Sequence, residues 1–213
     1  MAIKVLAGFG LTFSLTIACF LTAVLVAVFT CAGFLSKNGV IRTVVKVYNG
    51  IMIKIPPLVM LMLFALILTG DKNTGSLLIA YVGLSLFVAA NLAGVFHGGF
   101  CSVAKGEIEV ARTFGMSKRQ TFFHIMLPQI LGNIAPVCMS MFVMCVQITS
   151  VASVIGVQEF LGVAGSIEND VVSILIAVTG YFVIGTIGDF AITRMGKRKH
   201  INSKEYLGKG EVR

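Results

Sequence analysis

Charged side chains are scarce in this chain. Aspartate, glutamate, lysine and arginine make up only 12% of its 213 residues, whereas 57% are hydrophobic and the mean hydropathy is +0.95. Such a composition leaves too little polar surface to cover a water-soluble globule of this size. The shortage of charge therefore argues against a soluble enzyme or binding domain and makes the lipid bilayer the expected solvent.

Motifs for enzymatic chemistry are missing as well. The chain has no G-x-x-x-x-G-K segment followed by Ser or Thr, so it lacks the phosphate loop that ATP chemistry requires. It has no H-E-x-x-H motif, and neither His97 nor His124 belongs to a paired ligand motif, so no metal is expected. The five cysteines lack metal-ligand spacing and receive no role. An intramembrane enzyme is accordingly disfavoured.

Five apolar stretches are candidates for membrane-spanning helices. A span needs about 20 residues, because its backbone polar groups must be satisfied within the segment. The first continues past the length of a signal-peptide core, so we expect it to be a helix. The second is short, and a snorkelling Lys54 would extend it at its cytoplasmic end. The stretches are Gly8–Leu35, Ile55–Thr69, Ser76–Phe96, Ile130–Ile155 and Val171–Ile192. They predict one all-α, polytopic transmembrane domain over 1–213.

The basic residues are distributed by loop. With five spans, three regions share one side of the membrane, and only Lys4 and Lys72 lie opposite. The positive-inside rule therefore predicts an external N-terminus and a cytoplasmic C-terminus. This distribution accounts for the net charge of +8, so no nucleic-acid partner is expected. The residues on the shared side are Lys37, Arg42, Lys46, Lys54, Lys105, Arg112, Lys118 and Arg119, with seven more from Arg194 onward.

The longest cytoplasmic interruption, about 101–128, reads as two short helices. In the first, Ile108, Ala111 and Phe114 recur at helical spacing, and Gly115 stands at the expected C-cap. We expect Pro128 to end the second helix before the fourth span begins.

The start of the second helix carries its own signal. Ser117 is followed three residues later by Gln120, which predicts a capping box. On spacing alone, an ordinary solvated hairpin that joins two spans accounts for this loop. The order of its residues supplies more information than the spacing does.

That order resembles the cytoplasmic "EAA" loop of binding-protein-dependent ABC importer permeases. In that family the loop forms a coupling helix that docks in a cleft of the ATPase, and its glycine permits the bend between two helices. Val110 stands where the family has a second alanine. The matching residues, which the resemblance makes candidate ATPase-coupling residues, are Glu109, Ala111, Gly115, Ile125, Leu127 and Pro128.

The resemblance covers about residues 12–167 and is closest to permeases of polar amino acid uptake. Pro57 and Leu58 match a family segment before the second span, Gly98 and Gly99 match a Gly-Gly pair, and the run from Thr149 to Glu159 is similar throughout. The resemblance implies a type I ABC importer permease fold in a bacterial inner membrane. It also implies an ABC ATPase dimer carrying ATP and Mg²⁺, a second permease and an extracytoplasmic solute-binding protein, with no cofactor in this chain.

Charged positions of the family are lost here. A family acidic residue falls at Gly94, an arginine at His97, and a Lys-Asp pair at Gln147 and Ile148. Ionisable groups at membrane depth are costly and are usually retained for function. Either the solute is less polar than charged amino acids, or a different permease supplies most binding groups. We favour the second explanation and thus a mixed permease pair.

Polar groups remain along the spans. They are possible substrate-pathway residues, although Gln147 and Asn91 would equally serve to bridge or pack helices. Asp189 lies near Arg194 at the cytoplasmic end of the fifth span, where an ion pair is the expected arrangement. Gly94 and Gly98 have G-x-x-x-G spacing, which predicts close packing. The candidate pathway residues are Asn91, Ser140, Gln147, Thr149 and Ser150.

Two rival readings remain open. An ATP-independent channel or secondary transporter would usually show a buried ionisable relay or inverted repeats, and neither is clear in the sequence. A purely structural membrane subunit would need no site at all. The ordered coupling-loop pattern favours the importer subunit, in which the 109–124 hairpin would move as a rigid element.

Overall fold

The computed structural model describes residues 2–68, 75–165 and 170–210, and the regular structure in these ranges is helical. The longer helices are α1 (Ala2–Phe34), α2 (Gly39–Lys54), α3 (Pro57–Leu68), α4 (Ser76–Cys101), α7 (Leu127–Ile148) and α9 (Asp170–Gly210). The shorter elements are α5 (Lys105–Thr113), α6 (Lys118–Thr121), the π-helical turn η1 (Phe122–Met126), the 3₁₀ segment η2 (Thr149–Ile155) and α8 (Phe160–Ala164). The expected all-α class is confirmed.

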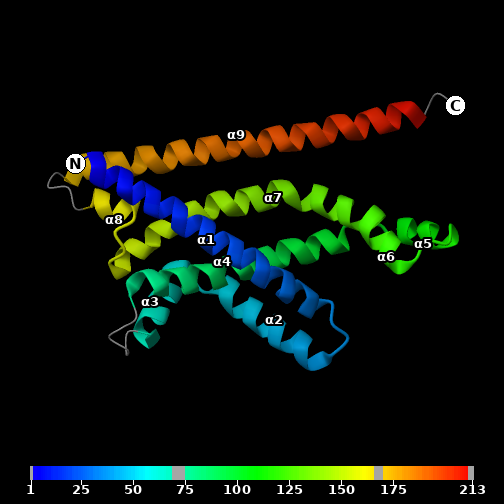
Figure 1. The fold of residues 1–213 in the computed structure, drawn as a ribbon, viewed down its shortest axis with the longest axis horizontal. Coiled ribbons are helices and arrows are strands. Elements are labelled where there is room, and N and C mark those ends of the chain that lie inside the picture. Colours follow the sequence, from blue (N-terminus) through cyan, green and yellow to red (C-terminus); the bar gives the residue numbers. More distant parts are fainter. Residues whose placement is uncertain (1, 69–74, 166–169, 211–213) are drawn as a thin grey trace.

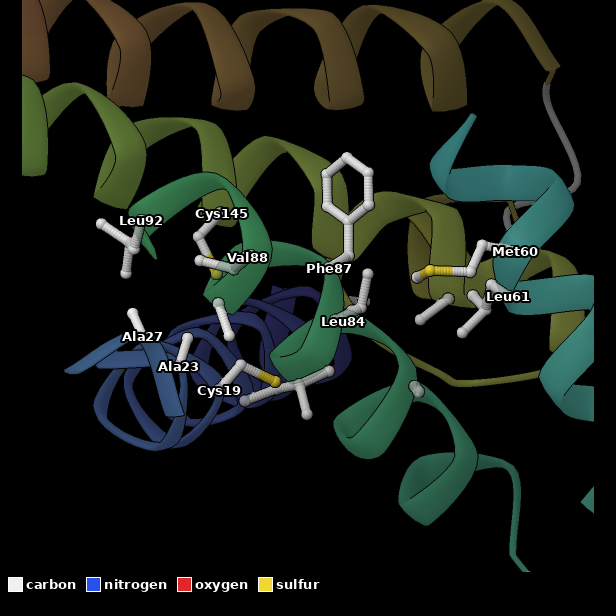
Figure 2. Packing of buried hydrophobic residues seen from close by; sticks show 14 of the residues in the cluster. Cys19, Ala23, Ala27, Met60, Leu61, Leu84, Phe87, Val88, Leu92 and Cys145 are labelled. Carbon is white, nitrogen blue, oxygen red and sulfur yellow. The ribbon is translucent and has the colours of Figure 1, made fainter. Parts of the chain in front are cut away.

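The core forms where α1 lies across α4. Cys19, Ala23 and Ala27 repeat every fourth residue on one face of α1, and all three are completely buried. Leu84 and Val88 fill the facing side of α4, as Figure 2 shows. Small side chains on one helix let the two backbones approach closely, which strengthens dispersion contacts where the lipid offers no hydrophobic driving force.

In the described part of the chain, four helical segments are long and apolar enough to cross a membrane, and α2 with α3 adds a bent pair as a fifth candidate. The predicted third and fifth spans lie within α4 and α9, and the predicted first span lies within α1 except for its last residue, Leu35. The fourth predicted span covers most of α7 and all of η2. The count of five spans therefore agrees with the helices, provided that the bent pair is one crossing.

The second predicted span, Ile55–Thr69, coincides with the second helix of the bent pair. Its helix α3 has only 12 residues and meets α2 at an angle of 112°, so a full crossing at this place would have to include α2. The bend falls at Ile55 and Pro56, because the residue before a proline disfavours helical geometry. Lys54 thus ends α2 at the bend. Thr69 lies outside the described residues.

The sequence did not predict helix α2, because the expected spans are uniformly apolar stretches. This helix is amphipathic and carries Arg42, Lys46 and Lys54 on exposed positions. Its other face is tied to α4. The hydroxyl of Tyr48 donates to the Leu86 carbonyl at 2.8 Å, and Asn49 Nδ2 donates to the Ala90 carbonyl at 2.6 Å. These bonds place α2 beside the middle of α4.

The two ends of the bundle differ in content. Figure 1 shows the N-terminus, α3 and α8 at one end, and the α1–α2 connection with α5 and α6 at the other. Lys37, Lys105 and Arg112 belong to the second end. The long helix α9 lies along the outside of the bundle, against α7 and α8, and extends toward the hairpin end.

Candidate functional site

The α5–α6 hairpin projects from the bundle at the basic end (Figure 1). Its turn depends on Gly115, which has a φ of +78°, a conformation that costs an L-residue about 1–2 kcal/mol. The Met116 N–H donates to the Ala111 carbonyl at 3.1 Å, and the Gly115 N–H donates to the Arg112 carbonyl at 3.0 Å. This is a Schellman-like C-cap, so the predicted role of Gly115 in ending α5 is confirmed.

The predicted capping box is present at the next helix. Gln120 Oε1 accepts from the Ser117 N–H at 2.9 Å, and Ser117 Oγ accepts from the Gln120 N–H at 3.3 Å. Both ends of the turn are therefore satisfied by local hydrogen bonds.

The residues of α5 divide between two faces. Ala111 is 3% exposed, and Ile108 is half-buried against the cluster that contains Val103 and Ile130. Phe114, expected on the same face, is instead 83% exposed, because the chain leaves helical geometry at the C-cap and turns its side chain outward. Glu109 is also exposed. The hairpin thus presents a carboxylate and an aromatic ring on its free surface.

Two hydrogen bonds fasten the hairpin region to α7. The Gln129 side-chain amide donates to the Glu107 carboxylate, and Asn133 Nδ2 donates to Ser102 Oγ at 2.8 Å. The first bond joins α5 to α7, and the second joins the C-cap of α4 to α7.

Ile125, Leu127 and Pro128 do not belong to a separate second helix. The helix is continuous from Lys118 through α7, so Pro128 does not end it. The π-helical turn η1 explains this, since the Leu127 N–H donates to the Phe122 carbonyl. The wider turn moves the carbonyl that the Pro128 ring would otherwise strike. Ile125 and Leu127 are half-buried, and Pro128 is exposed.

The five candidate pathway residues do not form one site. Asn91 Nδ2 donates to the Phe87 carbonyl at 2.9 Å, and Ser140 Oγ donates to the Pro136 carbonyl at 3.2 Å, so each bonds within its own helix. Thr149 is completely buried, with its hydroxyl 2.6 Å from the Val146 carbonyl. Gln147 and Ser150 alone come together, in a groove between α7 and α9.

This α7–α9 groove has a volume of about 450 Å³. The sequence reasoning missed its α9 side, although one signal was available: Asp189 is an acidic residue inside an apolar stretch. The ion pair expected between Asp189 and Arg194 is absent from the described residues, because the guanidinium of Arg194 lies over the Phe190 ring, 4.5 Å from its centroid. The α9 residues that line the groove include Tyr181, Gly185, Thr186 and Asp189.

A second polar cluster lies toward the N-terminal end. Glu159 is completely buried. Its Oε2 accepts from the Thr12 hydroxyl at 3.1 Å and from the Tyr181 hydroxyl at 3.0 Å, while Oε1 accepts from the Gly162 N–H at 3.0 Å. The carboxylate therefore joins α1, α8 and α9. No group of His, Cys, Asp and Glu in the described part of the chain has metal-site geometry.

Known proteins are similar to this chain in sequence. The family model described as binding-protein-dependent transport system inner membrane component matches residues 20–201. The glutamate/aspartate import permease protein GltK of Escherichia coli is 27% identical over 90% of this chain and 91% of its own length. The L-cystine transport system permease protein TcyB of Bacillus subtilis is 31% identical over 71% of this chain and 65% of its own.

A solved structure has the same fold. It is described as the crystal structure of an amino acid ABC transporter with histidines, and it superposes with a TM-score of 0.83 at 24% identity, over 92% of this chain and 94% of that one. The family match and this architecture lead to one assignment. The chain belongs to the family of binding-protein-dependent transport system inner membrane components, and is thus the membrane subunit of a transporter and not an enzyme.

Proposed function

We propose that this chain is the membrane permease through which an ATP-driven importer moves amino acids into a bacterial cell. The observation that carries the proposal is the capped α5–α6 hairpin, held to α7 by the Glu107–Gln129 bond and exposing Glu109 and Phe114 at the basic end. The relatives GltK and TcyB are named for amino acid import and transport, which supports the solute class.

Family membership implies a separate ATPase, since the chain carries no phosphate loop. In this proposal an ABC ATPase dimer holds ATP and Mg²⁺ and receives the hairpin. Exposed Phe114 fits such a role, because buried aromatic anchors supply much of the energy of protein interfaces. ATPase closure would push α5, and the Glu107–Gln129 bond would carry that motion into α7.

The proposed orientation has the N-terminus outside and the C-terminus in the cytoplasm. The grouping of basic residues at the hairpin end supports it. The N-terminal end with α8 would then meet an extracytoplasmic solute-binding protein. In this proposal the loop Val157–Val171 engages that protein, and residues 166–169 of the loop lie outside the described residues.

A second permease completes the proposed pathway, and we favour a mixed pair. Asn91, Ser140 and Thr149 each donate to a carbonyl of their own segment, so these donors are not directed at a solute. A partner that is richer in polar groups would supply the remainder. The lipid bilayer covers the outward apolar surfaces.

Co-purification from native membranes, with mass spectrometry counting the subunits, tests the proposal. Recovery of an ATPase and ATP-dependent amino acid uptake by the reconstituted complex are the expected results, and a second permease sequence would support the mixed pair. A folded chain that is isolated alone and moves solute without ATP would favour the alternative, an ATP-independent channel or secondary transporter.

A further inference from the structure

Asp189 lies at the middle depth of the bundle. A Cβ added at the adjacent Gly188 would overlap the Val143 side chain, so α9 touches α7 at this level. The neighbouring Phe142 packs edge-to-face on Phe20, with ring centroids 5.2 Å apart, and Phe20 is near the midpoint of α1. The carboxylate is therefore at membrane depth and not at the cytoplasmic end of the fifth span.

A carboxylate at this depth requires a compensating partner. Moving an unpaired charge out of water is expensive, and acidic residues in spans usually pair with a cation or line a polar pathway. Asp189 forms no ion pair within the described parts of the chain, and Arg194 is engaged with Phe190. The groove that contains Asp189 is open, so a cation from outside this chain can reach it.

The hydroxyls around the groove are used as donors. Ser150 Oγ donates to the Gln147 carbonyl at 2.7 Å, Thr186 Oγ1 to the Phe182 carbonyl at 2.8 Å, and the Tyr181 hydroxyl to Glu159 Oε2 at 3.0 Å. A hydroxyl has one proton and two acceptor sites, so each of these offers only lone pairs to the groove. The lining is rich in acceptors, and the Gln147 amide is its one uncommitted side-chain donor among the described residues.

A ligand that suits this lining must bring hydrogen-bond donors and positive charge. A primary ammonium supplies three donors, and a guanidinium supplies five. The Gln147 amide can donate to the carboxylate of the same solute. A solute with net negative charge would bring more acceptors and face repulsion from Asp189.

We infer that Asp189 anchors the positively charged group of the transported solute in the α7–α9 groove, which therefore selects cationic and zwitterionic amines over anionic solutes. The inference rests on the proposed function and narrows it to a charge class. Asp189 is also a residue that determines specificity, because Gln147, Ser150 and Thr186 carry no charge.

The test compares binding of arginine, glutamine and glutamate to the intact purified complex in nanodiscs. The wild-type complex should bind arginine and glutamine more tightly than glutamate. Asp189→Asn should weaken arginine binding about tenfold or more and remove the preference against glutamate. Asp189→Glu should keep the order, and Thr179→Val, on an exposed position of α9 outside the groove, should change nothing.

A second measurement keeps the inference testable if Asp189→Asn fails to assemble into the complex. In a complex with Thr186→Cys, mass spectrometry follows modification at position 186 by cationic and by anionic thiol reagents. Faster reaction of the cationic reagent and protection by arginine are expected. A site that is protected without solute would mean that the partner permease covers Asp189, and this result overturns the inference.

Other outcomes separate this inference from the proposed function. ATP-driven import of amino acids with an unchanged charge order in Asp189→Asn would overturn the anchor alone. A further outcome is a complex that contains an ATPase and shows the cationic labelling preference, yet binds none of the three amino acids. That result would overturn the proposed solute class, but it would leave the preference of the groove for cations intact. Tighter binding of glutamate than of arginine to wild type overturns the anchor directly.

Discussion

Glu159 accepts a hydrogen bond from Thr12 across 147 positions of sequence, at 3.1 Å and in a completely buried setting. The Phe160 N–H in turn donates to Thr12 Oγ1 at 3.0 Å. One hydroxyl thus links the first helix to the start of α8, while Tyr181 adds α9 through the same carboxylate. Three segments that are distant in sequence depend on this cluster for their relative position.

Replacement of the carboxylate should destabilise this end of the bundle. Glu159 receives donors at both oxygens, so Glu159→Gln places an amide N–H against a donor and should lower the stability by about 1–3 kcal/mol. Thermal loss of far-UV circular dichroism in detergent measures the change. Thr12→Val should also lower the melting temperature, and Thr12→Ser should lower it only slightly. Melting temperatures equal to that of the wild-type protein in all three variants would contradict the role of the cluster.

Adjacent glycines of α4 should respond in opposite ways. A Cβ at Gly99 would overlap Ile134 Cγ2 and approach Ile130 Cγ2 to 3.2 Å, whereas Gly98 has nothing within 4 Å. Gly99→Ala should therefore destabilise the protein by about 1–3 kcal/mol through overpacking. Gly98→Ala is the matched control and should be neutral or slightly stabilising, as is usual for alanine in a helix. The same melting experiment decides, and equal effects would count against this packing of α4 on α7.

The turn of the hairpin should matter for association with the ATPase. Glu109→Ala together with Gly115→Val removes the exposed carboxylate and places a branched residue at φ +78°, which should weaken association about tenfold. Gly106→Ala is the control, because Gly106 lies in α5 with open space around it. Pull-down of the ATPase from detergent extracts measures the loss, and undiminished recovery with the double variant would argue against docking at this hairpin.

The bond between Glu107 and Gln129 should affect coupling more than assembly. Gln129→Leu removes the donor that ties α5 to α7, so ATP hydrolysis should continue while less solute moves per ATP hydrolysed. Glu107→Gln preserves a hydrogen-bonding pair and should retain more coupling. The measurement is the ratio of uptake to phosphate release in proteoliposomes. A normal ratio in Gln129→Leu would mean that motion reaches α7 by another path.

Several sequence expectations depended on local interactions and were confirmed. Gly115 ends α5, and Ser117 with Gln120 starts α6, because caps involve residues within a few positions of each other. The Gly94–Gly98 spacing was less informative. A Cβ at either position would have nothing within 4 Å, and the tight approach occurs at Gly99 instead.

Hydropathy and charge distribution by themselves determined that the chain is an all-α membrane protein, with most spans in the expected places and most of the basic residues toward one end. The capping signals at Gly115, Ser117 and Gln120 determined where the α5–α6 hairpin turns. Only the tertiary structure decided that Thr149 is buried while Gln147 and Ser150 line the groove that contains Asp189. It also decided that Glu159 joins α1 to α9. The reason is physical: nearly uniform apolarity makes a segment a span, but the rotation of each helix follows from close packing against distant partners.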